Sequence, residues 1–232
     1  MRPAWQFVLV IAALLLINVV PAYIWGIDGA YAWRLLSWAG TILLFLVALI
    51  IVGRRMTNDW RGVLVDKRNV MSLSRLQLVI WTTIIISGML TAAIANVVTP
   101  LIDPNTHAVT HIPDPLVLGI QPEIWGLRGI SGTSFVATPI ILDRDPASVS
   151  TNTGNTWEWA DIFLGDKTTN DGRVDLSKVQ QFFFTVIVVA VFMMKLGYTF
   201  ATTDKVMFPA IDTGFVALLG ISHAAYLIHK AS

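Results

Sequence analysis

The sequence predicts an all-α fold: a polytopic transmembrane helical bundle of about six spans. Of the 232 residues, 55% are hydrophobic and only 13% are charged, and the mean hydropathy is +0.66. A soluble domain typically has about a quarter charged residues, so this chain has too few charges to cover a water-facing surface. The charges also cluster between long apolar stretches, as a lipid bilayer requires. The first predicted partner is therefore the bilayer itself.

Each predicted span is an apolar stretch of about 20 residues, the length that a helix needs to cross the hydrocarbon core. Tryptophans fall near the ends of several of these stretches, as expected at a membrane–water interface. The six predicted spans cover residues 4–26, 33–53, 75–98, 121–142, 178–201 and 211–229. The stretch 121–142 is the weakest of them, because it contains Arg128, several glycines and Pro139.

The lysines and arginines predict the direction of the chain, since cytoplasmic segments of membrane proteins are enriched in them. With both termini in the cytoplasm, twelve of the sixteen lie on the inner side. The four that lie outside or towards the outer face are Arg34, Arg128, Lys195 and Lys205. The opposite orientation would invert this bias. We therefore predict that the N-terminus and the C-terminus are both cytoplasmic.

Two sequence motifs occur twice, in the same order. The stretch LSRLQ at 73–77 is followed by LRGIS at 127–131, and the similar stretch LSKVQ at 176–180 is followed by LLGIS at 218–222. A unit of two spans returns the chain to its starting side, so successive units have the same orientation. The motifs therefore predict a parallel two-helix internal repeat.

This repeat divides the chain into four predicted parts. Residues 1–56 form an N-terminal two-helix membrane segment, residues 57–145 the first two-helix repeat, and residues 175–232 the second. Residues 146–174 form a cytoplasmic loop between the repeats. The tryptophans and apolar residues within 157–163 predict a short interfacial helix that lies on the membrane.

The duplicated motifs resemble those of a group of uncharacterised bacterial multi-pass inner-membrane proteins. The resemblance covers about residues 60–230. It implies a similar fold and a location in the bacterial inner (plasma) membrane, and it implies no catalytic residue.

The glutamine of each first motif falls in the opening turns of a predicted helix. Gln77 and Gln180 either hydrogen-bond to a neighbouring helix or line a shared polar site. Asn18 and Asn96 are expected to hydrogen-bond between helices. In the second motif, small residues four positions apart favour close contact between helices in lipid. The predicted helix-packing residues are Gly129, Ser131, Gly220 and Ser222.

Three titratable residues within the predicted spans are candidates for a pathway or a polar interior. His223 lies near the middle of the last span, where a histidine relays protons or hydrogen-bonds to another helix. Arg128 and Lys195 lie in the outer parts of their spans. They either extend to the membrane surface or, repeated around an oligomer, form a basic ring that favours anions.

No catalytic residue, cofactor or metal site is predicted, and the chain is not expected to be an enzyme. It has no cysteine, and its net charge of +1 gives no reason to expect a nucleic-acid partner. His107 and His111 have a metal-compatible spacing, but nearby prolines disfavour the helix that this spacing needs. The aspartates within 166–175 resemble a calcium loop, yet Lys167 and Lys178 occupy the positions where carboxylates are required.

The leading functional hypothesis is an oligomeric membrane channel or small-solute permeation protein, because parallel duplication and homo-oligomeric assembly commonly build a central pathway. One alternative is a non-transporting membrane scaffold or accessory subunit. Another is a membrane sensor that signals through its cytoplasmic loop. A permeation protein predicts a continuous polar pathway, whereas a scaffold predicts tightly packed, dry contacts between helices.

The predicted orientation can be tested by cysteine labelling, because the chain has no cysteine of its own. Single cysteines at Thr106 and Lys205 should react with a membrane-impermeant reagent from outside, and one at Ser150 should not. Labelling of position 150 from outside would contradict the predicted orientation.

Overall fold

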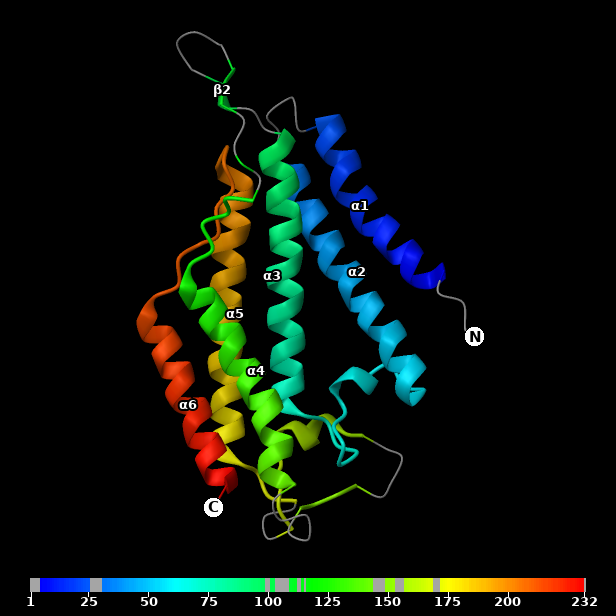
Figure 1. Cartoon of the computed structure of the whole chain (residues 1–232), viewed down its shortest axis with the longest axis vertical. Helices are drawn as coiled ribbons and strands as arrows, with labels where there is room; N and C mark the ends of the chain where they lie inside the picture. The colour runs from blue at the N-terminus through cyan, green and yellow to red at the C-terminus, as the bar shows by residue number, and fades with distance from the viewer. Residues whose placement is uncertain are drawn as a thin grey trace. The chain divides into compact units, whose positions relative to one another are not determined.

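The described residues form six α-helices, two 3₁₀ segments and one short strand pair in a computed structural model (Figure 1). The structure describes residues 5–25, 31–98, 101–102, 109–111, 114, 116–143, 149–152, 157–168 and 172–231. The helices are α1 (Trp5–Trp25), α2 (Ala32–Thr57), α3 (Leu73–Val98), α4 (Pro122–Leu142), α5 (Leu176–Thr202) and α6 (Thr213–Ala231). The strands β1 (Leu101–Ile102) and β2 (Val109–His111) pair antiparallel. The predicted all-α fold class is confirmed.

Four of these helices, α1, α2, α3 and α5, are long and apolar enough to cross a membrane. The chain is therefore a multi-pass membrane protein, but the prediction of six spans is wrong by this measure. The apolar part of α6 covers only Thr213–Ala225. Helix α4 contains Arg128 and many glycine, serine and threonine residues, which lower its hydropathy.

Contacts divide the chain into two compact units, and α2, α3 and α5 each contribute residues to both. Unit 1 comprises residues 1–51, 83–121 and 191–210, and unit 2 comprises residues 52–82, 122–190 and 211–232.

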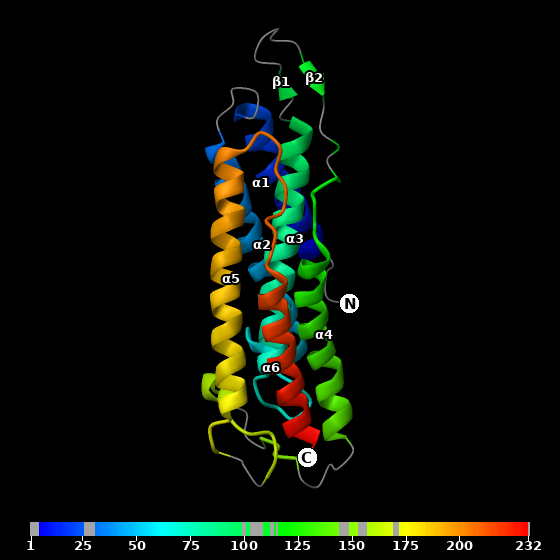
Figure 2. The same ribbon diagram turned by 90° about the vertical axis from the view of Figure 1, so that its left-hand side faces the viewer.

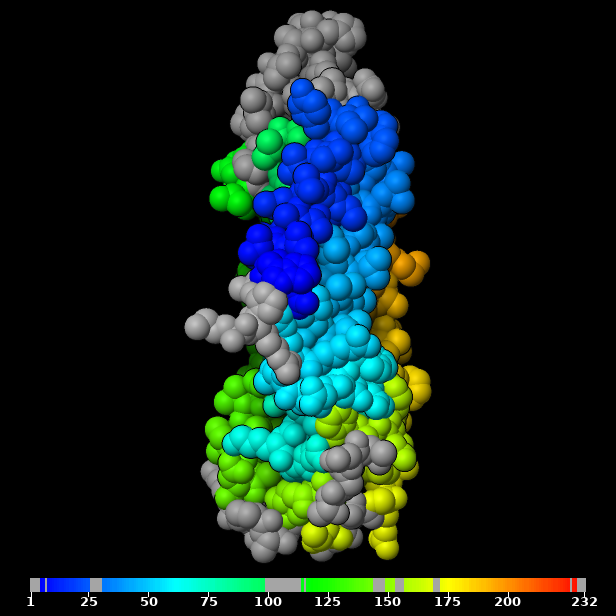
Figure 3. Space-filling view, turned by 90° about the vertical axis from the view of Figure 1, so that its right-hand side faces the viewer, coloured from blue at the N-terminus to red at the C-terminus, as the bar shows by residue number. Residues whose placement is uncertain are grey.

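In unit 1, buried polar side chains connect α1, α2 and α3. Asn18 donates a hydrogen bond to Thr41 Oγ1 at 2.7 Å and accepts one from Thr91 Oγ1 at 2.8 Å. Nearby, Trp38 Nε1 donates to Ser87 Oγ at 3.1 Å. Figure 3 shows α1 (dark blue) lying along α2 (lighter blue), with most of its apolar side chains exposed, as expected of a helix that faces lipid. Asn18 thus joins helices as predicted.

Unit 1 also contains non-helical chain that precedes α4 and α6. The segment after α5 runs down beside α3 (Figure 2) and hydrogen-bonds to the segment that precedes α4, from Phe208 N to Leu118 O at 2.7 Å. Asn96 of α3 donates to Val206 O at 3.0 Å and accepts from Val206 N at 2.8 Å. Non-helical backbone at membrane depth is stable only where its N–H and C=O groups have hydrogen-bond partners. The Asn96 side chain provides a partner for both groups of Val206.

In unit 2, α3 and α5 begin at the same end, and α4 packs along α6 in the same direction (Figures 1 and 2). The pairs α3–α4 and α5–α6 thus have the orientation that a parallel repeat requires. Superposition of the two pairs stays a prediction.

Replacing Asn96 with leucine should destabilise the protein, because the buried N–H and C=O groups of Val206 both lose their partner. We expect the free energy of unfolding to fall by about 2–4 kcal/mol, the loss typical of two unsatisfied buried groups. Thermal unfolding in detergent measures this effect. The control is Val97→Ala at the adjacent exposed position; equal stability of both variants would contradict the assigned role of Asn96.

Candidate functional site

Two loops of unit 2 fold with the same succession of elements before α3 and before α5. In the first loop, the 3₁₀ segment η1 (Gly62–Leu64) is followed by an isolated antiparallel bridge between Val65 and Met71. In the second loop, η3 (Trp159–Phe163) is followed by a bridge between Leu164 and Val174. We call residues 58–72 and 157–175 the cap loops. Statements about the second cap loop concern residues 157–168 and 172–175.

Equivalent backbone hydrogen bonds close the two cap loops. Ser72 N donates to Leu64 O at 2.9 Å in the first, and Asp175 N donates to Phe163 O at 2.8 Å in the second. The residue at the end of each loop also accepts the first hydrogen bond of the following helix, from Leu76 N to Ser72 O and from Val179 N to Asp175 O. The two similar helix starts therefore each follow a loop with similar backbone hydrogen bonds, which the short sequence motifs did not indicate.

An apolar cluster joins the cap loops. Ile162 of η3 is 2% exposed and packs with Leu64 and Met71 of the first loop. The segment predicted as an interfacial helix is thus the 3₁₀ segment η3, held against protein on its Ile162 side. Its Trp159 is half-exposed, with its ring 6.2 Å from that of Trp60. Contact of these rings with the membrane stays a prediction.

A buried network of charges ties the cap loops to the first turn of α5. Arg68 pairs with Asp66 at 2.8 Å and with Asp166 at 2.7 Å, and Lys178 pairs with Asp166 at 2.8 Å. Lys178 Nζ also donates to Leu164 O. Burial by itself lowers the pKa of the Arg68 guanidinium, but the carboxylates of Asp166 and Asp66 outweigh that effect and raise it. All four side chains are at most 13% exposed.

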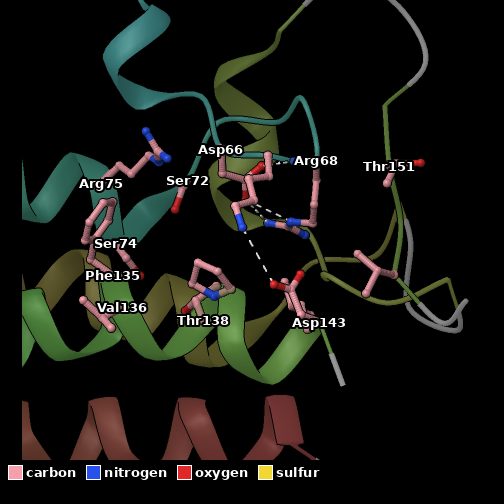
Figure 4. Close-up of a pocket in the computed structure, with 14 residues that line it drawn as sticks. Asp66, Arg68, Ser72, Ser74, Arg75, Phe135, Val136, Thr138, Asp143 and Thr151 are labelled. Atoms are coloured by element: carbon pink, nitrogen blue, oxygen red, sulfur yellow. Dashed lines mark hydrogen bonds and ion pairs between the residues drawn. The ribbon is translucent and has the colours of Figure 1, made fainter. Parts of the chain in front are cut away.

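A pocket of about 420 Å³ lies between the first cap loop, the start of α3 and the last turns of α4 (Figure 4). Arg75 lies over one wall, with its guanidinium carbon 5.3 Å from the centre of the Phe135 ring. Thr138 also lines the pocket; it is 5% exposed, and its Oγ1 has no hydrogen-bond partner. At the rim, Lys67 pairs with Asp143 at 3.7 Å, and both side chains are largely exposed.

The two predicted glutamines have different environments. Gln77 is 1% exposed, and its Nε2 donates to Thr185 Oγ1 of α5 at 2.8 Å. The prediction that Gln180 faces the interior is wrong, because its side chain is exposed. The interior residue is the adjacent Gln181, which is 1% exposed and donates to Ser222 O of α6 at 3.3 Å. Successive helical residues differ by about 100° in direction, so aligning the motifs by residue type selected the wrong glutamine.

His223 of α6 is 4% exposed, and its Nδ1 lies 2.6 Å from Ser134 Oγ of α4. The histidine thus contacts another helix. Arg128, on α4 in unit 2, is partly exposed. Lys195, on α5 in unit 1, is exposed, with its Nζ 3.5 Å from Ala210 O. A pathway role for these three residues stays a prediction.

The predicted packing role of Gly129 is wrong. Gly129 is exposed, and a Cβ added there would have no neighbour within 4 Å. A Cβ on Gly220 would lie 3.7 Å from Ile130 Cδ1, an ordinary contact that does not require glycine. The serines of the same motifs, Ser131 and Ser222, are 3% and 7% exposed. Gly129 lies two residues before Ser131, and two helical residues place side chains on nearly opposite faces.

The predicted external-loop histidines contribute no described site. His107 lies outside the described residues, and the side chain of His111 is likewise not described. Among the residues that the structure describes, no group of three or more His, Cys, Asp or Glu side chains suits a metal ion.

The fold and the site together define a class: a multi-pass α-helical membrane protein with two folded, charge-stabilised cap loops. No protein family, curated protein or solved structure matches this chain. The resemblance to bacterial inner-membrane proteins therefore stays a prediction.

The buried charge network should contribute strongly to stability. In Asp166→Asn, Lys178 loses its ion pair and Arg68 loses one of two carboxylates, and breaking a buried pair typically costs about 3–5 kcal/mol. We expect a comparable fall in the free energy of unfolding, measured by thermal denaturation in detergent. The matched control, Asp143→Asn, breaks the exposed pair with Lys67 and should cost less than about 1 kcal/mol. Equal effects of the two substitutions would contradict the role given to Asp166.

Proposed function

We propose that this protein is a non-transporting membrane scaffold or accessory subunit. The observation that carries the proposal is that several polar side chains between the helices form hydrogen bonds from one helix to another. Asn18 connects α1 with α2 and α3 in unit 1. In unit 2, Gln77 connects α3 with α5, Gln181 connects α5 with α6, and His223 connects α6 with α4. Bonds of this kind hold helices in a fixed arrangement within lipid.

The side chains that a conducting pathway would use are therefore engaged in helix–helix contacts. A permeating ion needs polar groups that exchange their partners for the ion or its water. His223 and Gln181 instead bond to Ser134 and to the backbone of Ser222. This pattern favours the scaffold over the channel that the sequence first suggested.

The internal repeat supports a scaffold role and is part of the proposal. Each half would supply one cap loop, one long helix that starts beneath it, and one shorter helix that ends at the same side. Two such units in one chain would present two similar surfaces to partner helices. Large apolar side chains exposed on α1, α2 and α5 are the surface that lipid and the helices of a second copy would cover, so we retain the homo-oligomer as the expected form.

A conducting pathway is the competing function. It is favoured by two buried oxygens without hydrogen-bond partners, Gln77 Oε1 and Thr83 Oγ1 on α3. Such atoms are where water would bind if a pathway ran along this helix. The bacterial inner membrane and cytoplasmic termini are the proposed setting for either function.

Reconstitution in liposomes separates the two functions. The scaffold predicts that wild-type protein gives no ion flux above protein-free liposomes between about pH 5 and 7.5, the range in which a histidine titrates. It also predicts that His223→Ala lowers thermal stability, because Ser134 loses its partner, whereas Ile221→Ala at an exposed position two residues earlier does not. A pH-dependent flux that His223→Ala abolishes, with stability unchanged, would establish the channel instead.

A further inference from the structure

The pocket of unit 2 contains a cation that no described carboxylate neutralises. Of its three basic side chains, Arg68 is paired with Asp66 and Asp166, and Lys67 is paired with Asp143. The ion pairs found among the described residues do not include Arg75, which donates a long hydrogen bond of 3.5 Å to Val63 O. The guanidinium of Arg75 thus retains most of its capacity to bind an anion.

The second cap loop provides a comparison within the same chain. Lys178 occupies the motif position that corresponds to Arg75, but it is 4% exposed and is bound by Asp166 and by Leu164 O. In the first loop, the carboxylate of Asp66 is bound to Arg68. The site at Arg75 therefore lacks the internal counter-ion that closes the site at Lys178.

Hydroxyl groups complete the polar side of the pocket. Thr138 Oγ1 is buried without a hydrogen-bond partner, and an unsatisfied buried hydroxyl is unfavourable unless a ligand or water pairs with it. Ser72 and Ser74 at the start of α3 line the same pocket. Phosphate oxygens accept hydrogen bonds from a guanidinium and from hydroxyls, which matches this set of donors.

The other side of the pocket is apolar and leads outward. Phe135, Val136, Pro139 and Leu142 of α4 form this wall. Val136 is 58% exposed, so the wall continues onto the outer surface of α4. A volume of about 420 Å³ lies within the usual range for small-ligand sites. A fitting ligand thus has an anionic head and an apolar body.

We propose that this pocket binds an anionic phospholipid, with its phosphate at Arg75 and Thr138 and its glycerol and upper acyl chain along Phe135 and Val136. The pocket lies where the apolar helix α3 begins, the level at which phospholipid headgroups meet the hydrocarbon core. The predicted orientation makes this the cytoplasmic leaflet. The inference does not depend on whether the protein is a scaffold or a channel.

Native mass spectrometry of the full chain in detergent, titrated with phosphatidylglycerol or phosphatidylcholine, tests the proposal. We expect tighter binding of phosphatidylglycerol, and about tenfold weaker binding by Arg75→Gln, since a hydrogen bond to a charged group contributes on the order of 1.4 kcal/mol or more. Arg173→Gln is the control, because it removes the same charge from an exposed arginine away from the pocket. Equal binding of both lipids, or equal losses in both variants, would overturn the proposal.

A second variant keeps the test decisive if Arg75→Gln does not fold. Thr138→Val removes the unpaired hydroxyl with little change in shape, so it should raise the melting temperature of the lipid-free protein and weaken phosphatidylglycerol binding. Unchanged lipid binding by this variant would count against the site. Glycerol phosphate separates the two sources of phosphate: if it displaces phosphatidylglycerol at similar concentrations, the ligand is a soluble phosphate ester and the lipid proposal is wrong.

Discussion

A polar group that leaves water must find a partner inside the protein, and this requirement explains most of the described structure. In unit 1, Asn18 satisfies hydroxyls of two neighbouring helices. In unit 2, Asp166 neutralises Arg68 and Lys178 together. A partner removed from such an interior leaves an uncompensated donor, acceptor or charge. The few groups that lack partners, such as Thr138 Oγ1, therefore mark the places where a ligand or water is expected.

The same requirement explains how non-helical chain can precede α4 and α6. A helix satisfies its own backbone, whereas an extended segment needs partners from elsewhere. Asn96 bonds both backbone groups of Val206, and the two extended segments bond to each other through Phe208 and Leu118. These contacts let the chain return through non-helical segments followed by shorter helices, where six uniform apolar spans were predicted.

The two cap loops share backbone features and differ in the environment of their basic residues. Both loops have a 3₁₀ segment, an isolated bridge and the same closing hydrogen bond. Their basic residues differ in environment: Lys178 is buried against Asp166, while Arg75 borders an open pocket. Arg68 pairs with Asp66 of the first loop and shares Asp166 of the second loop with Lys178, so neither of these carboxylates pairs with Arg75. Lys178 of the second copy of the motif is thus neutralised by a carboxylate, whereas Arg75 of the first copy is available to bind an anion.

Composition and hydropathy were sufficient to predict an all-α membrane protein and the positions of its helices, because length and apolarity are properties of contiguous sequence. Residue type and the duplicated motifs also identified Asn18, Gln77 and His223 as polar groups within helices. They did not distinguish Gln181 from Gln180, or the buried Ser131 from the exposed Gly129, because adjacent residues differ only in direction around the helix axis. The cap loops, the ion pairs of Asp166 and the pocket at Arg75 required the tertiary structure. Each of them depends on residues from segments distant in sequence that lie close together in the fold, and a local sequence pattern does not predict such contacts.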